Sequence, residues 1–170
     1  STEEGASSWN SCILCGAGKY GEMAGASSVD ACTSCEAGTY STQAGVSSLA
    51  SCTACVQGKY GATSGASSAT SCTPCAAGTY GNATASTSAL QCIACPQGRF
   101  NPNEASQSID ACQPCEINSF NNQSGATSCV VCEQGTYALE VGYTACKQCN
   151  GTMQAVTCTG CAPGEYFSMH

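Results

Sequence analysis

The motif Cys-x-x-Cys recurs nine times along the chain and accounts for all 18 cysteines among its 170 residues. The first six copies, starting at Cys12, follow one another every 20 residues, and the last three steps shorten to 17, 17 and 12 residues. Cysteine at this density is typical of small extracellular folds that disulfides hold together. Self-similarity at a short fixed period predicts a tandem repeat architecture.

Two further positions recur inside the repeats. A glycine stands three residues after the second cysteine and an aromatic residue five residues after it, as in Gly18 and Tyr20. Asn118 replaces the glycine in one repeat, and we expect it to adopt the left-handed conformation, which Asn tolerates better than most residues. A Gly-x-Ser-Ser segment follows in the early repeats, beginning at Gly25, Gly45 and Gly65.

The cysteine spacing predicts the boundaries of the units. They are a partial unit at 1–11, repeats at 12–31, 32–51, 52–71, 72–91 and 92–111, shortened repeats at 112–128 and 129–145, a degenerate repeat at 146–157 and a partial unit at 158–170. The repeat that Cys146 opens has Thr152 and Gln154 where glycine and an aromatic residue belong. We therefore expect that repeat to be distorted.

Bulky apolar side chains are too few to build one packed core, since Leu, Ile, Val and Phe together number 18 residues. Burial stabilises by about 25 cal/mol per Å² and must offset the ordering entropy of the chain, so cross-links or metal must substitute for a core. The Gly/Ser/Thr-rich intervals lack a helical apolar period, whereas short extended pieces around Gly-x-Tyr predict minimal hairpins. The expected fold class is small and disulfide-rich, an elongated tandem array of short irregular or β-hairpin units with little or no helix. Each unit is expected to contact only its neighbours.

Charge and residue types exclude several classes of function. The chain carries 4 basic and 11 acidic side chains, and its basic residues lie far apart, whereas nucleic-acid binding needs clustered Lys and Arg. No apolar run is long enough to predict a transmembrane segment. The single histidine is His170, and the carboxylates form neither a recurrent pair nor a calcium loop. We expect no catalytic site, no metal site and no cofactor.

Three chemistries use Cys-x-x-Cys pairs. Zinc fits the spacing, because two pairs 16 residues apart match a zinc ribbon, but nine motifs at two per metal leave one over. A redox centre needs one reactive pair on a βαβ scaffold, which nine copies without helices do not provide. Structural disulfides agree best with the secreted character of the Ser/Thr-rich intervals, and zinc stays open as the alternative.

The segment from Cys35-Glu-Ala-Gly-Thr-Tyr to Cys52 resembles the single-disulfide module of tumour-necrosis-factor-receptor ectodomains. Residues 12–170 as a whole resemble the ephrin-receptor-like cysteine-rich repeats of cell-surface proteins, on the basis of cysteine spacing and the Gly-x-aromatic pattern. The resemblance implies an extracellular or cell-surface location. It implies no single function, because unrelated surface proteins share the module.

In the tumour-necrosis-factor-receptor module, the cysteine before x-x-Gly-x-aromatic bonds to the next cysteine downstream, which here joins the second cysteine of one motif to the first of the next. Each loop of this size contributes about 3 kcal/mol in the chain-entropy account. A competing scheme bonds Cys12 to Cys32 and Cys15 to Cys35, and so on, leaving one motif unpaired. For this chain the resemblance implies Cys15–Cys32, Cys35–Cys52, Cys55–Cys72, Cys75–Cys92, Cys95–Cys112, Cys115–Cys129, Cys132–Cys146 and Cys149–Cys158.

One alternation keeps the competing scheme open. The residue after the repeat glycine alternates between basic and hydroxyl side chains, and chance is one explanation. The other is that successive repeats face alternate sides of the array. The positions are Lys19, Thr39, Lys59, Thr79, Arg99 and Ser119.

The family pairing leaves Cys12 and Cys161 without partners, and both ends of the sequence carry half-repeats. We expect either that further repeats of a longer chain complete them or that copies of the chain join head to tail. In the second case Cys161 of one copy bonds to Cys12 of the next, and such a contact builds a filament.

The intervals also carry glycosylation sequons at Asn82, Asn122 and Asn150, which predict covalent glycans. The sequence therefore predicts an extracellular, non-catalytic structural protein: a glycosylated rod, stalk, coat or head-to-tail filament subunit. The alternative is a receptor or adhesin ectodomain that binds a protein or glycan ligand. Its binding site is then expected within 112–161, where the repeats depart from the regular pattern.

Overall fold

The computed structural model describes residues 14–23 and 28–148. Their regular structure consists of seven antiparallel hairpins, each made of two strands of two residues. No α-helix occurs among these described residues. The pairs are β1 (Lys19–Tyr20) with β2 (Thr33–Ser34), β3 (Thr39–Tyr40) with β4 (Thr53–Ala54), β5 (Lys59–Tyr60) with β6 (Thr73–Pro74), β7 (Thr79–Tyr80) with β8 (Ile93–Ala94), β9 (Arg99–Phe100) with β10 (Gln113–Pro114), β11 (Ser119–Phe120) with β12 (Val130–Val131), and β13 (Thr136–Tyr137) with β14 (Lys147–Gln148). The prediction of a small disulfide-rich hairpin array is confirmed.

A tight turn starts each hairpin. In the fifth one the Arg99 amide donates to the carbonyl of Pro96 (3.2 Å), and Gly98 between them has φ +77°. This left-handed conformation costs an L-residue free energy, which explains the recurrent glycine. Asn118 takes the same conformation at φ +62°, so the prediction for that position is confirmed.

Each hairpin is closed at its base by a disulfide, and most of them have a backbone hydrogen bond there as well. Cys95 and Cys112, whose Cα atoms are 5.6 Å apart, bracket β9 and the loop after it. The amide of Cys115, just after β10, donates to the carbonyl of Gly98 (2.8 Å). A two-stranded hairpin of this length is not stable alone in water, so the cross-link and the neighbouring repeats must hold it.

Single 3₁₀ turns precede the second strands of the first five hairpins: η2 (Val29–Ala31), η3 (Leu49–Ser51), η4 (Ala69–Ser71), η5 (Ala89–Gln91) and η6 (Ile109–Ala111). A serine caps each of them, and in the first three turns it is the second residue of the Ser-Ser pair; for example, the Ala50 amide donates to Ser48 Oγ (3.2 Å). Serine favours this role because its short side chain reaches the backbone two residues on.

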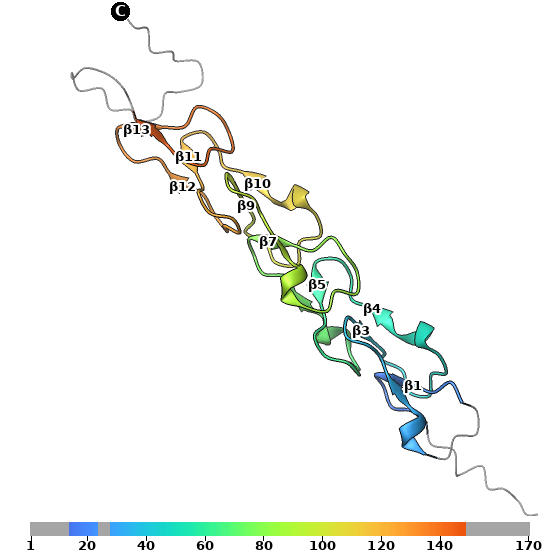
Figure 1. Cartoon of the computed structure of the whole chain (residues 1–170). Coiled ribbons are helices and arrows are strands. Elements are labelled where there is room, and N and C mark those ends of the chain that lie inside the picture. The colour runs from blue at the N-terminus through green and yellow to red at the C-terminus, as the bar shows by residue number, and fades with distance from the viewer. Residues whose placement is uncertain (1–13, 24–27, 149–170) are drawn as a thin grey trace, which may run out of the picture. The chain divides into compact units, whose positions relative to one another are not determined.

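The contacts divide the chain into two compact bodies. The first body comprises Ser1–Pro74 and Ala83–Gln91, and the second comprises Cys75–Asn82 and Cys92–His170. Within each body the hairpins follow one another in chain order (Figure 1). Every described disulfide and every hairpin pairing lies inside one body.

Repeats also contact the second repeat along the chain, which corrects the expectation that each contacts only its neighbours. A Cβ atom added to Gly18 would overlap the carbonyl oxygen of Gly65, two repeats later in the first body. The same holds for Gly98 and Gly142 in the second body. The absence of a side chain at the turn glycine allows this backbone-to-backbone approach.

Candidate functional site: an interior of cystines and asparagines

The structure joins 14 cysteines in seven disulfides, each linking the second cysteine of one motif to the first of the next. These are seven of the eight pairs that the family resemblance implied. The remaining pair, Cys149–Cys158, lies outside the described residues, as do Cys12, Cys161, Thr152 and Gln154. The seven disulfides are Cys15–Cys32, Cys35–Cys52, Cys55–Cys72, Cys75–Cys92, Cys95–Cys112, Cys115–Cys129 and Cys132–Cys146.

These cystines form the apolar interior. Apart from Ala138, the buried apolar side chains of the described residues are cysteines, and Cys35, Cys95 and Cys115 are completely buried. Sulfurs in disulfides are not the thiolates that zinc requires. Across residues 14–23 and 28–148, no group of three or more His, Cys, Asp or Glu side chains is placed to hold a metal ion.

Backbone hydrogen bonds tie each repeat to the next in a constant pattern. In the second body the amide of Gly98 donates to the carbonyl of Asn121 (2.8 Å) and the amide of Asn101 to that of Ala126 (3.0 Å). A bond in the reverse direction runs from the amide of Gly125 to the carbonyl of Cys95 (2.8 Å). The first body contains the same three bonds, Gly38 to Gly61, Ser41 to Ala66 and Gly65 to Cys35, at 2.7 to 3.0 Å.

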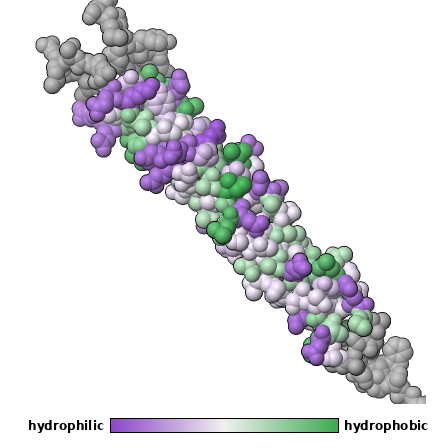
Figure 2. All heavy atoms as spheres, in the orientation of Figure 1, coloured by the Kyte–Doolittle hydropathy of each residue, from purple (hydrophilic) through white to green (hydrophobic). Residues whose placement is uncertain are grey.

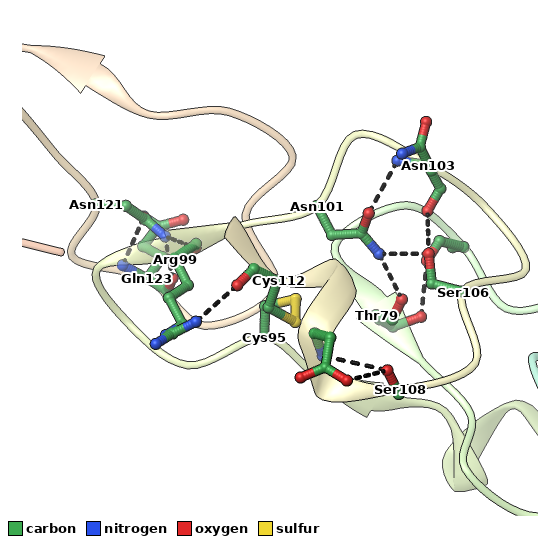
Figure 3. The surroundings of a disulfide bond; sticks show 12 residues. Thr79, Cys95, Arg99, Asn101, Asn103, Ser106, Ser108, Cys112, Asn121 and Gln123 are labelled. Carbon is green, nitrogen blue, oxygen red and sulfur yellow. Dashed lines mark hydrogen bonds between the residues drawn. A yellow bond between two sulfur atoms is a disulfide. The ribbon is translucent and has the colours of Figure 1, made fainter. Parts of the chain in front are cut away.

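Two asparagine side chains add a second set of ties in the second body (Figure 3). Asn101 is fully buried, and its Nδ2 donates to the carbonyl of Thr79 and to Ser106 Oγ, both at 2.9 Å. Its Oδ1 accepts from the amide of Asn103 at 3.1 Å. The side chain thus links strand β7 of the preceding repeat to the loop of its own repeat. A buried amide group without such partners would cost free energy, so its full satisfaction makes it a stabilising element.

Asn121 repeats the arrangement one repeat later. Its Nδ2 donates to the carbonyls of Arg99 and Gln123, both at 2.8 Å, and its Oδ1 accepts from the Gln123 amide at 3.0 Å. The sequence interpretation missed both asparagines. The available signal was the repeat position itself, which holds only small or polar residues before them: Gly21, Ser41, Gly61 and Gly81.

The alternating position after the repeat glycine has a local role in the structure. Its hydroxyl members donate to the carbonyl three residues earlier, as from Thr79 to Ala76 (2.7 Å) and Ser119 to Glu116 (2.8 Å). Arg99, a basic member, instead donates from its guanidinium to the carbonyl of Cys112 at 2.8 Å. The hydroxyl members and Arg99 therefore bind backbone carbonyls of their own repeat.

A shallow, open hollow on the surface is lined by residues 142–147, where the Lys147 ammonium lies 5.4 Å from the centroid of the Tyr143 ring. Exposed aliphatic side chains are scattered over both bodies, Leu90 (94% exposed) in the first and Val131 (72%) in the second among them (Figure 2). Among the described residues no helix has the length and apolarity to cross a bilayer.

The sequons lie in the loops that follow the first strands of hairpins. Asn82 follows β7 and Asn122 follows β11, and both residues are exposed. Asn150 lies outside the described residues.

Comparison with known proteins agrees with this architecture. Residues 61–112 match a family described as tyrosine-protein kinase ephrin type A/B receptor-like. No curated protein matches the chain. The matched segment contains two complete disulfide loops, Cys75–Cys92 and Cys95–Cys112. The same hairpin, disulfide and turn glycine recur on both sides of it. The family match at 61–112 and the series of disulfide-bonded repeats around it support an ephrin-receptor-like cysteine-rich repeat, a receptor-like extracellular type of module.

Proposed function

We propose that the chain is a non-catalytic structural protein of the cell exterior, serving as a stalk, a surface coat or a filament subunit. The observation that carries this proposal is the constancy of the interior. The same cystine, turn and three backbone ties recur from repeat to repeat, and nothing in the described residues sets one repeat apart as a reaction centre.

The buried polar groups support a structural role. A catalytic side chain must present a free donor, acceptor or nucleophile to a substrate. The amide groups of Asn101 and Asn121 are instead committed to backbone partners of their own and the preceding repeat. The disulfides support the location, because such bonds persist in oxidising compartments.

Electron microscopy of the purified, oxidised full chain tests the structural proposal. Filaments or sheets that grow with protein concentration are the expected result, with the reduced and alkylated chain as the control that should not assemble. Dispersed particles at every concentration, together with saturable binding to cells, would contradict it. Head-to-tail joining through Cys161 and Cys12 predicts in addition a ladder of bands on a non-reducing denaturing gel.

A receptor or adhesin ectodomain is the second candidate, favoured by the receptor-like family match at 61–112. The irregular repeats carry exposed aliphatic side chains that a ligand could cover, including Val130, Val131 and Val141. Changing Val130 and Val131 to Ser should abolish saturable cell binding if this candidate holds, while leaving the hairpin hydrogen bonds intact. Ala69→Ser in the first body, at an exposed apolar position, is the matched control.

A further inference from the structure

The two sequons in the described residues occupy the same position of the repeat. Asn82-Ala83-Thr84 and Asn122-Gln123-Ser124 both begin two residues after the repeat aromatic, Tyr80 or Phe120. They stand 40 residues apart, which is two regular repeats, and both asparagines belong to the second body. The repeat between them has Pro102 at this position.

The fold separates these asparagines from the structural ones that precede them. Asn121 is buried and its amide group is hydrogen bonded, whereas Asn122 next to it is exposed. Gln123 bonds back to Asn121 through its amide and its carbonyl, so the loop closes over Asn121 and leaves Asn122 outside. Asn82 has the same surroundings: it is exposed, and the buried residue before it, Gly81, donates to the carbonyl of Ser106 (2.9 Å).

The sequon hydroxyls are accessible as well. Thr84 and Ser124 are exposed and lie in the bend or turn that follows each asparagine. The buried asparagines do not compete as acceptors, because Asn101 is followed by Pro102 and Asn103, and Asn121 by Asn122 and Gln123, so neither starts a sequon.

We propose that Asn82 and Asn122 are a pair of N-glycosylation sites, one in every second repeat of this part of the chain. Asn Nδ2 forms a bond to the anomeric carbon of a lipid-linked oligosaccharide. The bond from that carbon to the diphosphate oxygen breaks, the lipid diphosphate leaves with the electron pair, and Nδ2 loses one proton to a base. The product is a bulky hydrophilic group on an exposed loop, which leaves the buried ties of Asn101 and Asn121 intact.

This inference rests on the extracellular location proposed above, and its test keeps the two apart. The full chain is expressed in a eukaryotic host behind a cleavable secretion leader, and its presence in the medium is measured separately from its glycans. Peptides are treated with peptide N-glycosidase, which converts a glycosylated Asn to Asp, and are read by mass spectrometry. Conversion at both Asn82 and Asn122 is expected, and a secreted chain unmodified at either one would overturn the pair.

Variants test whether the repeat position decides the modification. Asn82→Gln and Asn122→Gln should each abolish the gel-mobility shift that one glycan causes. Ser124→Ala should abolish the same shift as Asn122→Gln. Asn103→Gln, at an exposed asparagine outside any sequon, should remove none. Pro102→Asn combined with Glu104→Thr creates a sequon at the equivalent position of the intervening repeat, and a third glycan should appear there. A secreted double variant without it would contradict the claim that this loop position is an acceptor.

Discussion

The turn glycine supports two separate features of the array, its own left-handed turn and the approach of a backbone two repeats away. Position 98 requires glycine for both reasons, because its φ is +77° and the carbonyl of Gly142 occupies the place of a side chain. Gly135 has a similar φ of +85°, but no other described atom lies within 4 Å of the Cβ position. The two glycines therefore separate the cost of the turn from the cost of the approach.

Gly135→Ala should destabilise its hairpin by about 0.5 to 1 kcal/mol, because the strain of a left-handed L-residue exceeds the entropy gained by replacing glycine. Gly98→Ala should cost about 2 kcal/mol more, because the added methyl group displaces the backbone at Gly142. Amide hydrogen exchange on the oxidised chain measures both losses locally. Equal losses for the two variants would show that the contact between Gly98 and Gly142 contributes nothing.

The buried asparagine is the second residue on which the array depends. Asn101→Ala removes two donated bonds and one accepted bond, and it leaves the Thr79 carbonyl without its side-chain donor. At about 1 kcal/mol per net hydrogen bond, the expected loss is about 3 kcal/mol, seen as faster exchange in β7 and β9. Asn103→Ala, at an exposed position, is the control and should change exchange little. Similar exchange in both variants would contradict the role given to Asn101.

Two alanines take a conformation that suits glycine better. Ala85 and Ala105 have φ near +54° and stand where other repeats have Gly45, Gly65 or Gly125. Ala105→Gly should stabilise by about 0.5 to 1 kcal/mol, since relief of strain exceeds the entropy cost of glycine. Gly65→Ala, the reverse kind of change, should destabilise by a similar amount. Only the backbone strain contributes there, because the atom nearest to the added methyl group, Ser34 Oγ, is 3.4 Å away and leaves room. Chemical denaturation checks the signs, and a destabilising Ala105→Gly would refute this reasoning.

At the scale of the element, the hairpin is a product of its cross-link. Each strand has only two residues, so the disulfide supplies the closure that a longer strand pair would achieve through packing. The neighbouring repeats hold the outer side of the turn through the bonds of Gly98 and Asn101. A hairpin that loses its disulfide should therefore open locally and loosen the repeats bonded to it.

Cys95→Ser together with Cys112→Ser should destabilise the β9–β10 hairpin by about 3 kcal/mol, from the loop-closure entropy of a bridge between residues 17 apart. Exchange should accelerate at the amides of Cys115 and Gly125, which donate to Gly98 and Cys95. The hairpins β1–β2 and β3–β4 of the first body should keep their protection. Loss of protection at β1–β2 as well would contradict local opening.

At the scale of the whole molecule, the sequence predicted the features that repeat and missed those that depend on contacts between repeats. The cysteine period, the turn glycine and Asn118 were predictable, because each follows from a local backbone requirement that recurs every 20 residues. The partner of Asn101 lies 22 residues earlier, and that of Gly98 lies two repeats later. A repeat pattern specifies the unit but not the path by which successive units meet, so these contacts needed the structure.

Disulfide mapping of the non-reduced chain tests the central claim most directly, namely that each bridge joins the second cysteine of one motif to the first of the next. Thermolysin cleaves before bulky aliphatic residues, so cleavage before Ile93 and Val130 separates the two cysteines of their motifs. The claim predicts peptides that link Cys75 to Cys92 and Cys95 to Cys112. A peptide that links Cys92 to the fragment holding Cys112 and Cys115, as the competing scheme requires, would contradict it.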